Sequence, residues 1–180
     1  ISLFFVPLTF AQSMEKIYLW PNKVPNEVNE KHDAVPTDDT SRNVIRLTNV
    51  SNPVLEVFKP DVDKNNGSSI IICPGGGYRI LAINLEGYEI AKWLNKLGFT
   101  VFVLQYRVPN NELGALNDVQ RAIRFVRSKS KEYNINPEKL GVLGFSAGGS
   151  LVARDSTNFN RETYKKIDKI DDESCKPDFA

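Results

Sequence analysis

Ser146 lies in the pentapeptide Gly144-Phe145-Ser146-Ala147-Gly148, a spacing typical of a nucleophilic serine on a sharp strand-to-helix turn. The apolar run Leu140 to Phe145 predicts a short strand before it, and the Gly- and Ala-rich segment from Ala147 to about Ala153 predicts a helix after it. The turn would raise the Ser146 hydroxyl above the carboxyl edge of a sheet, where the helix N-terminus stabilises negative charge. We therefore expect Ser146 to attack an electrophilic carbonyl.

A second turn rich in glycine, Pro74-Gly75-Gly76-Gly77-Tyr78, follows the continuous apolar run Ser69 to Cys73. Three glycines leave backbone N–H groups unshielded, as the stabilisation of an oxyanion requires. A flexible turn or a phosphate-binding loop is the alternative. A dinucleotide fingerprint would need glycine where Ile80 stands, and no G-x-x-x-x-G-K-[ST] motif occurs. Together with the serine motif, the turn predicts an oxyanion hole formed by the amides of Gly76, Gly77 and Ala147.

Alternating strand and helix patterns surround these two motifs. The β-branched segments Val44 to Val50 and Val54 to Phe58 flank the turn signal Ser51-Asn52-Pro53 and predict an antiparallel hairpin. After the apolar strand that ends at Cys73 come an amphipathic helix, a strand, a second amphipathic helix and another strand, at residues 86–97, 99–108, 116–129 and 140–145. This order predicts an α/β domain over residues 44–180 with a mostly parallel sheet, preceded by a Pro- and Asn-rich lead-in over residues 12–43.

The first residues and the overall composition bear on compartment and partners. The apolar run over residues 1–11 has the pattern of a partial signal peptide and is too short to span a bilayer, so we expect a secreted or periplasmic protein without a membrane span. The 180 residues contain 23 Lys and Arg against 22 Asp and Glu, which makes nucleic acid an unexpected partner. With one histidine and two cysteines, we expect neither a zinc cluster nor another cofactor.

Four segments together resemble the esterase and lipase branch of the α/β-hydrolases, especially acetyl-xylan-esterase-like and related carbohydrate esterases. They read PGGGY, LQYRV, DVQRAIRFVR and GVLGFSAGGSLVA, and the resemblance covers about residues 44 to 154. It implies the α/β-hydrolase fold, Ser146 as nucleophile, and Gly76, Gly77 and Ala147 as oxyanion donors. Pro74 stands where lipase relatives have the histidine of H-G-G-G, and Ser150 stands where the esterases commonly have histidine.

The acid and the histidine that follow the nucleophile in this family have no clear counterpart here. No histidine follows Ser146, and His32, the single one, lies in the lead-in, where we expect a surface loop. Four aspartates do follow Ser146, in a Lys- and Asp-rich stretch that we interpret as a solvated insertion: Asp155, Asp168, Asp171 and Asp172. We therefore expect an incomplete domain, a fragment that reaches the onset of a sixth strand at 178–180, lacks the later strands and is inactive without its acid and histidine.

Two smaller expectations concern structural residues. In the family's sheet order the strands at Cys73 and Cys175 are not neighbours, so we expect two free thiols and no disulfide. We also expect Asp118 to contact Arg107 and Arg121 and to brace the second helix against the sheet.

Three functional hypotheses remain. The first is an exported serine hydrolase that removes acetyl groups from polysaccharide or cleaves small esters, with Ser146 forming an acyl-enzyme. The second is a serine peptidase of the prolyl-oligopeptidase type. Such peptidases normally carry a large accessory domain before the hydrolase portion, whereas only about 30 residues precede the first strand here. The third is a truncated, non-catalytic chain whose sheet exposes an apolar edge.

Overall fold

The protein is described by a computed structural model of residues 15–180. The signal peptide expected over residues 1–11 lies outside the described residues and stays a prediction. Between residues 15 and 180, no helix has the length and hydropathy needed to cross a bilayer.

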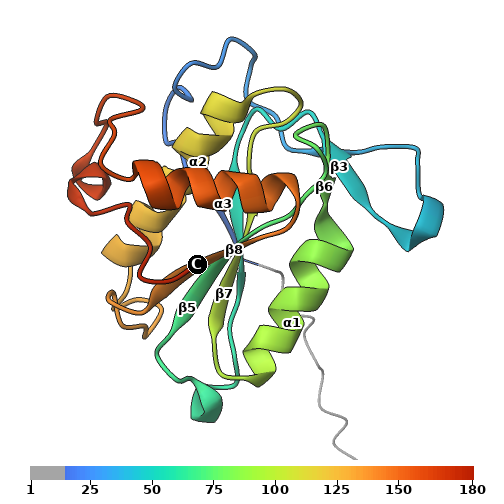
Figure 1. The fold of residues 1–180 in the computed structure, drawn as a ribbon. Helices are drawn as coiled ribbons and strands as arrows, with labels where there is room; N and C mark the ends of the chain where they lie inside the picture. The colour runs from blue at the N-terminus through green and yellow to red at the C-terminus, as the bar shows by residue number, and fades with distance from the viewer. Residues whose placement is uncertain (1–14) are drawn as a thin grey trace, which may run out of the picture.

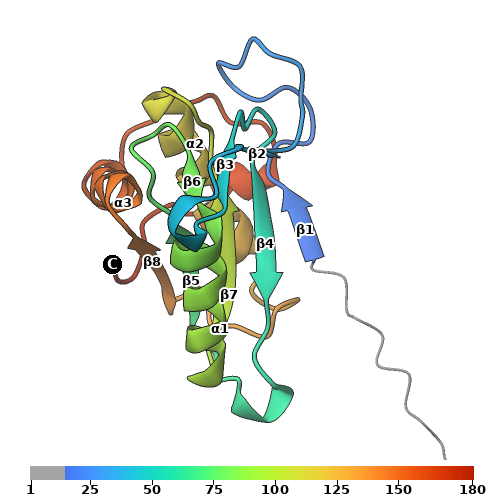
Figure 2. The same ribbon diagram turned by 90° about the vertical axis from the view of Figure 1, so that its right-hand side faces the viewer.

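A five-stranded sheet forms the centre of the molecule, in the order β1-β4-β7-β5-β8, which Figure 2 shows from one edge to the other. Its strands are β1 (Glu15–Tyr18), β4 (Val54–Phe58), β5 (Ser69–Cys73), β7 (Thr100–Gln105) and β8 (Leu140–Gly144). β5 is parallel to β7 and β8, whereas β4 is antiparallel to β1 and β7. This confirms the mostly parallel α/β sheet with antiparallel pairing on its N-terminal side.

Three α-helices and a small second sheet complete the fold (Figure 1). The helices are α1 (Glu89–Lys96), α2 (Glu112–Ser128) and α3 (Ala147–Asn158), the last extending beyond the predicted end near Ala153. The second sheet has the order β2-β3-β6, from β2 (Val35–Pro36), β3 (Arg46–Thr48) and β6 (Leu81–Ala82). A π-helical turn at Asn84–Tyr88 leads into α1, and short 3-10 turns lie at Ser41–Asn43, Val62–Lys64 and Lys169–Asp172.

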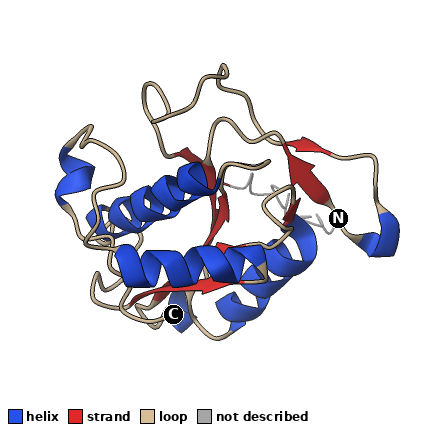
Figure 3. Cartoon of the chain, turned by 45° about the horizontal axis from the view of Figure 1, so that its top comes forward, coloured by secondary structure: helices blue, strands red, loops and turns tan. Residues whose placement is uncertain are grey.

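The helices cover the sheet on two faces, and the strand sequences show why (Figure 3). Side chains alternate along a strand, so a strand buried on both faces needs apolar residues throughout. In β5, Ile70 and Ile72 pack in one apolar cluster with Ala91 of α1. Ile71, between them, packs in the other cluster with Leu151 of α3. The continuous apolar run therefore supports both layers of the core.

The predicted hairpin between Val44–Val50 and Val54–Phe58 is wrong. β3 pairs with β2 and β6, whereas β4 enters the central sheet between β1 and β7. Two non-local contacts pull the intervening turn open: Val50 N donates to Val108 O at 2.9 Å, and Ser51 Oγ donates to Glu30 O at 2.6 Å. Since β4 is buried, it needs a partner on each edge, and β1 from the expected lead-in supplies one of them.

The acidic stretch after the serine motif is not a solvated insertion. Asp155 is fully buried on α3, and Asp171 is 3% exposed. Asp168 forms two hydrogen bonds with Arg121, of 2.8 and 2.6 Å. Only Asp172 behaves as expected, since it is exposed and pairs with Lys166 at 3.0 Å. Pairing with arginines on α2 draws this stretch onto the domain, and local composition could not show that pairing.

The predicted strand onset at residues 178–180 is confirmed as a parallel bridge between Gly141 and Phe179, on the free side of β8. Val142 N donates to Phe179 O at 3.0 Å, and Asp178 N donates to Leu140 O at 2.8 Å. The expectation for the cysteines is also confirmed, because Cys73 and Cys175 are both free and buried.

Candidate active site

Ser146 lies on a strained turn between β8 and α3. Its backbone has φ 51° and ψ −115°, a conformation that is costly for any residue other than glycine. The turn needs glycine on both sides: a Cβ on Gly144 would lie 2.2 Å from Gly148 O, and one on Gly148 would lie 2.0 Å from Cys73 O. The Ser146 side chain is exposed and makes no hydrogen bond to any described residue. The serine motif thus has the sharp strand-to-helix geometry that its spacing predicts.

The triple-glycine turn lies directly against Ser146 because of strand register. β5 and β8 are adjacent and parallel, with Cys73 opposite Gly144, so the segments that follow them leave the same edge of the sheet. A Cβ on Gly75 would lie 2.5 Å from Phe145 O and 3.1 Å from Ser146 Cβ. The close approach of the two segments therefore requires glycine at position 75.

Hydrogen bonds from three sides fix the shape of the glycine turn. Gly75 O accepts from Ala82 N at 3.0 Å and Gly75 N donates to Glu86 Oε2 at 2.7 Å, which closes the turn at its base. Tyr106, after β7, donates its hydroxyl to Pro74 O at 2.5 Å. Burial raises the pKa of Tyr106, so its phenol remains a neutral donor. Sequence reasoning missed Glu86 and Tyr106, because no motif marks a residue whose partner is a backbone group.

The backbone amides expected to hold an oxyanion belong to these two segments. Gly76 and Gly77 have φ of 140° and 63°, conformations open to glycine. Within residues 15–180, the amides of Gly76, Gly77 and Ala147 donate no hydrogen bond. Ala147 is also the first residue of α3, where the helix dipole favours negative charge. The arrangement offers unpaired donors beside an exposed hydroxyl, which is the combination that acyl transfer uses.

Residues 55–179, most of the chain, match the BD-FAE protein family. The chain belongs to the BD-FAE family. It is 44% identical over 93 residues to an acetylxylan esterase of Xylanibacter ruminicola, in an alignment that covers 51% of this chain and 19% of that protein. It is 30% identical over 186 residues to endo-1,4-beta-xylanase B of Butyrivibrio fibrisolvens, covering 91% of this chain and 28% of that protein.

Comparison with solved structures shows which fold the chain shares with known proteins. An acetyl ester-xyloside bifunctional hydrolase from Caldicellulosiruptor lactoaceticus matches with a TM-score of 0.69 and 36% identity, over 91% of this chain and 54% of that one. Esterase 2 of Thermogutta terrifontis matches with a TM-score of 0.64 and 19% identity, over 92% of this chain and 54% of that one. This BD-FAE chain is thus an esterase-like α/β-hydrolase that spans about half the length of these structures and less of the curated relatives.

His32 lies in an exposed loop, as expected. Its backbone N–H donates to Ser51 Oγ at 3.0 Å, and its Nδ1 lies 3.1 Å from Asp33 O. Between residues 15 and 180, no hydrogen bond joins His32 to Ser146. Ser150, at the position where relatives commonly have histidine, is exposed on the first turn of α3. The structure therefore brings together the serine and the glycine turn, and no hydrogen bond among residues 15–180 joins His32 to either of them.

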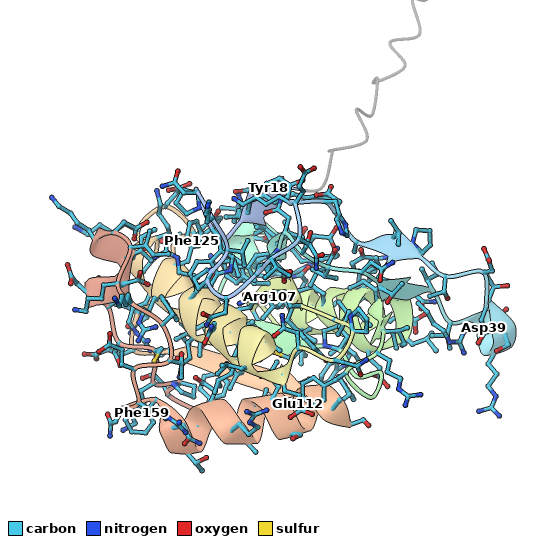
Figure 4. All side chains as sticks on the ribbon, turned by 90° about the horizontal axis from the view of Figure 1, so that it is seen from above. Tyr18, Asp39, Arg107, Glu112, Phe125 and Phe159 are labelled. Carbon is cyan, nitrogen blue, oxygen red and sulfur yellow. The ribbon has the colours of Figure 1, made fainter. Side chains whose placement is uncertain are left out.

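A buried ion pair holds α2 against the end of β7. Arg107 and Asp118 are both fully buried, with Arg107 Nη2 2.9 Å from Asp118 Oδ1, and Trp20 Nε1 donates to the same oxygen at 2.9 Å. Figure 4 shows Arg107 beside α2 in the interior. The expected contact of Asp118 with Arg107 is confirmed, but the expected contact with Arg121 is wrong. Arg121 pairs instead with Asp168 and Asp171, at 2.6 and 2.9 Å.

Proposed function

We propose that this BD-FAE chain carries the nucleophile and the oxyanion donors of a serine ester hydrolase acting on acetyl esters of polysaccharide or on small esters. The observation that carries the proposal is the exposed Ser146 at φ 51°, packed against the glycine turn. The names of its relatives, an acetylxylan esterase and an acetyl ester-xyloside hydrolase, support an acetylated xylan as the substrate class.

In the proposed reaction, Ser146 Oγ attacks the ester carbonyl carbon as its proton leaves to a base. The carbonyl oxygen becomes an oxyanion that accepts hydrogen bonds from the amides of Gly76, Gly77 and Ala147. The intermediate then collapses, the C–O bond to the alcohol breaks, and the alcohol oxygen takes a proton. Water cleaves the acetyl-serine in the second half-reaction and releases acetate.

The base is the part of this reaction for which the described residues supply no group. His32, the single histidine of the 180 residues, forms no hydrogen bond with Ser146 within residues 15–180. We therefore expect this chain by itself to acylate slowly, with the residual rate that the oxyanion donors and substrate binding provide.

The test is labelling of the 180-residue chain by a fluorophosphonate probe, with and without added imidazole as an external base. We expect slow labelling that imidazole accelerates, that Ser146→Ala abolishes and that the matched control Ser150→Ala leaves intact. Hydrolysis of p-nitrophenyl acetate should follow the same pattern. Labelling that persists in Ser146→Ala, or no labelling even with imidazole, would contradict the proposal.

A further inference from the structure

A polar cavity of about 460 Å³ opens at the same end of the sheet as Ser146. Three segments form it: the loop around Asn26 to His32, the turn at Asn49 to Ser51 before β4, and residues 108–111 after β7. β4 is antiparallel to β7, so the residues before β4 and those after β7 meet at the carboxyl end of the parallel strands. The cavity is within the size range of ligand sites in proteins.

The lining of this cavity favours a neutral ligand rich in hydroxyl groups. Among the described residues, its lining contains Glu27 and His32 but neither lysine nor arginine, and five asparagines: Asn26, Asn29, Asn49, Asn110 and Asn111. A carboxamide both donates and accepts hydrogen bonds, which matches the two roles of a sugar hydroxyl. An anionic ligand such as a phosphate ester would be expected to need a cationic partner.

Three of the asparagines have carboxamides that form no hydrogen bond with any described residue. Asn26, Asn49 and Asn110 have φ of 58°, 53° and 52°, in the left-handed region that asparagine tolerates. Among the described residues, none of their carboxamides makes a hydrogen bond. Glycine would satisfy the same backbone, so the turns do not account for the carboxamides. By contrast, Asn111 caps α2 by accepting from Gly114 N at 2.9 Å.

The cavity is physically joined to the glycine turn. Asn110 N donates to Tyr78 O at 2.7 Å, and Tyr78 directly follows Gly77. Figure 2 shows the loops of this end of the sheet in one row, with α3 on one side and the loop after β1 on the other. A polymer lying along this row would place one unit in the cavity and another near Ser146.

We propose that this cavity is a subsite for unesterified sugar units of a neutral polysaccharide whose acetyl ester reacts at Ser146. The inference rests on the proposed function for its choice of sugar, a xylan, and goes beyond it by assigning binding residues outside the reaction centre. Asn26, Asn49 and Asn110 donate to and accept from the sugar hydroxyls.

The test is titration of the isotope-labelled 180-residue chain with xylotetraose, followed by amide chemical shifts. Xylotetraose has no ester, so its binding is independent of Ser146 chemistry. We expect millimolar or tighter binding that perturbs the amides of Asn49 and Asn110. The double variant Asn49→Gly with Asn110→Gly, which keeps both turns, should weaken binding roughly tenfold.

The matched control is Asn43→Gly with Asn134→Gly, because these asparagines also have left-handed backbones, with φ of 57° and 51°, and do not line the cavity. This variant should bind as the parent does. Equal weakening in both variants, shifts confined to other surfaces, or no binding at millimolar xylotetraose would overturn the inference. Binding without Ser146 labelling would refute the proposed function alone, whereas labelling without binding would refute this subsite alone.

Discussion

Asp155 provides a test of how burial controls stability in this fold. Its side chain on α3 has no exposed surface, and within residues 15–180 neither of its oxygens has a partner at hydrogen-bond distance. Burial raises the pKa of Asp155 from 3.8 to about 7, against the opposing positive charge of Arg124. The difference corresponds to about 4 kcal/mol of stability that the folded protein loses when this carboxyl must ionise.

The raised pKa of Asp155 makes the free energy of unfolding depend on pH. Below about pH 4 the carboxyl is protonated in both the folded and the unfolded chain, and it costs nothing. From about pH 4 to 7 only the unfolded chain ionises, so the free energy of unfolding falls with rising pH by about 1.4 kcal/mol for each pH unit. Above about pH 7 the loss is complete. Asp155→Asn cannot ionise and removes this dependence.

The assay is urea unfolding of the parent chain and Asp155→Asn between about pH 4 and 8. The free energy gained by the variant relative to the parent should grow by up to about 4 kcal/mol across this range. Asp172→Asn is the matched control, because Asp172 is exposed on the surface, and it should track the parent at every pH. A constant difference between Asp155→Asn and the parent would refute the reasoning, because the folded environment would then not disfavour the charged form.

Three further predictions concern the site and its support. Gly148→Ala, whose Cβ would lie 2.0 Å from Cys73 O, should lower stability by about 1–3 kcal/mol and suppress fluorophosphonate labelling of Ser146. The neighbouring variant Gly149→Ala, whose Cβ would lie at a tight 3.2 Å from Gly144 O without overlapping it, should cost less stability and retain labelling. Glu86→Gln replaces the charged acceptor of Gly75 N with a neutral one. Thermal unfolding should show a loss of about 1 kcal/mol in stability, and fluorophosphonate labelling of Ser146 should slow. An unchanged labelling rate would mean that the glycine turn keeps its shape without the carboxylate. Arg107→Met leaves the buried carboxylate of Asp118 without its cationic partner and should lower the free energy of unfolding in urea by about 3–5 kcal/mol. A change near zero would contradict the assigned pairing.

The parts of the fold that the sequence predicted are those set by local pattern. The apolar run at Ser69–Cys73 and the glycines around Ser146 each constrain a few consecutive residues. A short window of sequence therefore contains the whole signal. The position of Ser146 against the glycine turn also followed, because adjacent parallel strands end at one edge.

The parts that were missed depend on partners far away in the chain. The turn at Ser51 looked like a hairpin, but its hydroxyl bonds to Glu30 O, 21 residues earlier. Asp168 and Asp171 looked solvated among lysines, but Arg121 pairs with both from α2. No window of local sequence contains both members of such a pair, so hydropathy and propensity assign each one to solvent.

The π-helical turn at Asn84–Tyr88 makes the segment between β5 and α1 sensitive to its length. Glu86 reaches Gly75 N from this turn, and successive residues of a helix project in different directions around its axis. Removing or inserting one residue ahead of Glu86 would swing its carboxylate to another face of the helix. The number of residues from Gly75 to Glu86 should therefore stay fixed among related chains, because the contact of Glu86 with Gly75 N depends on it.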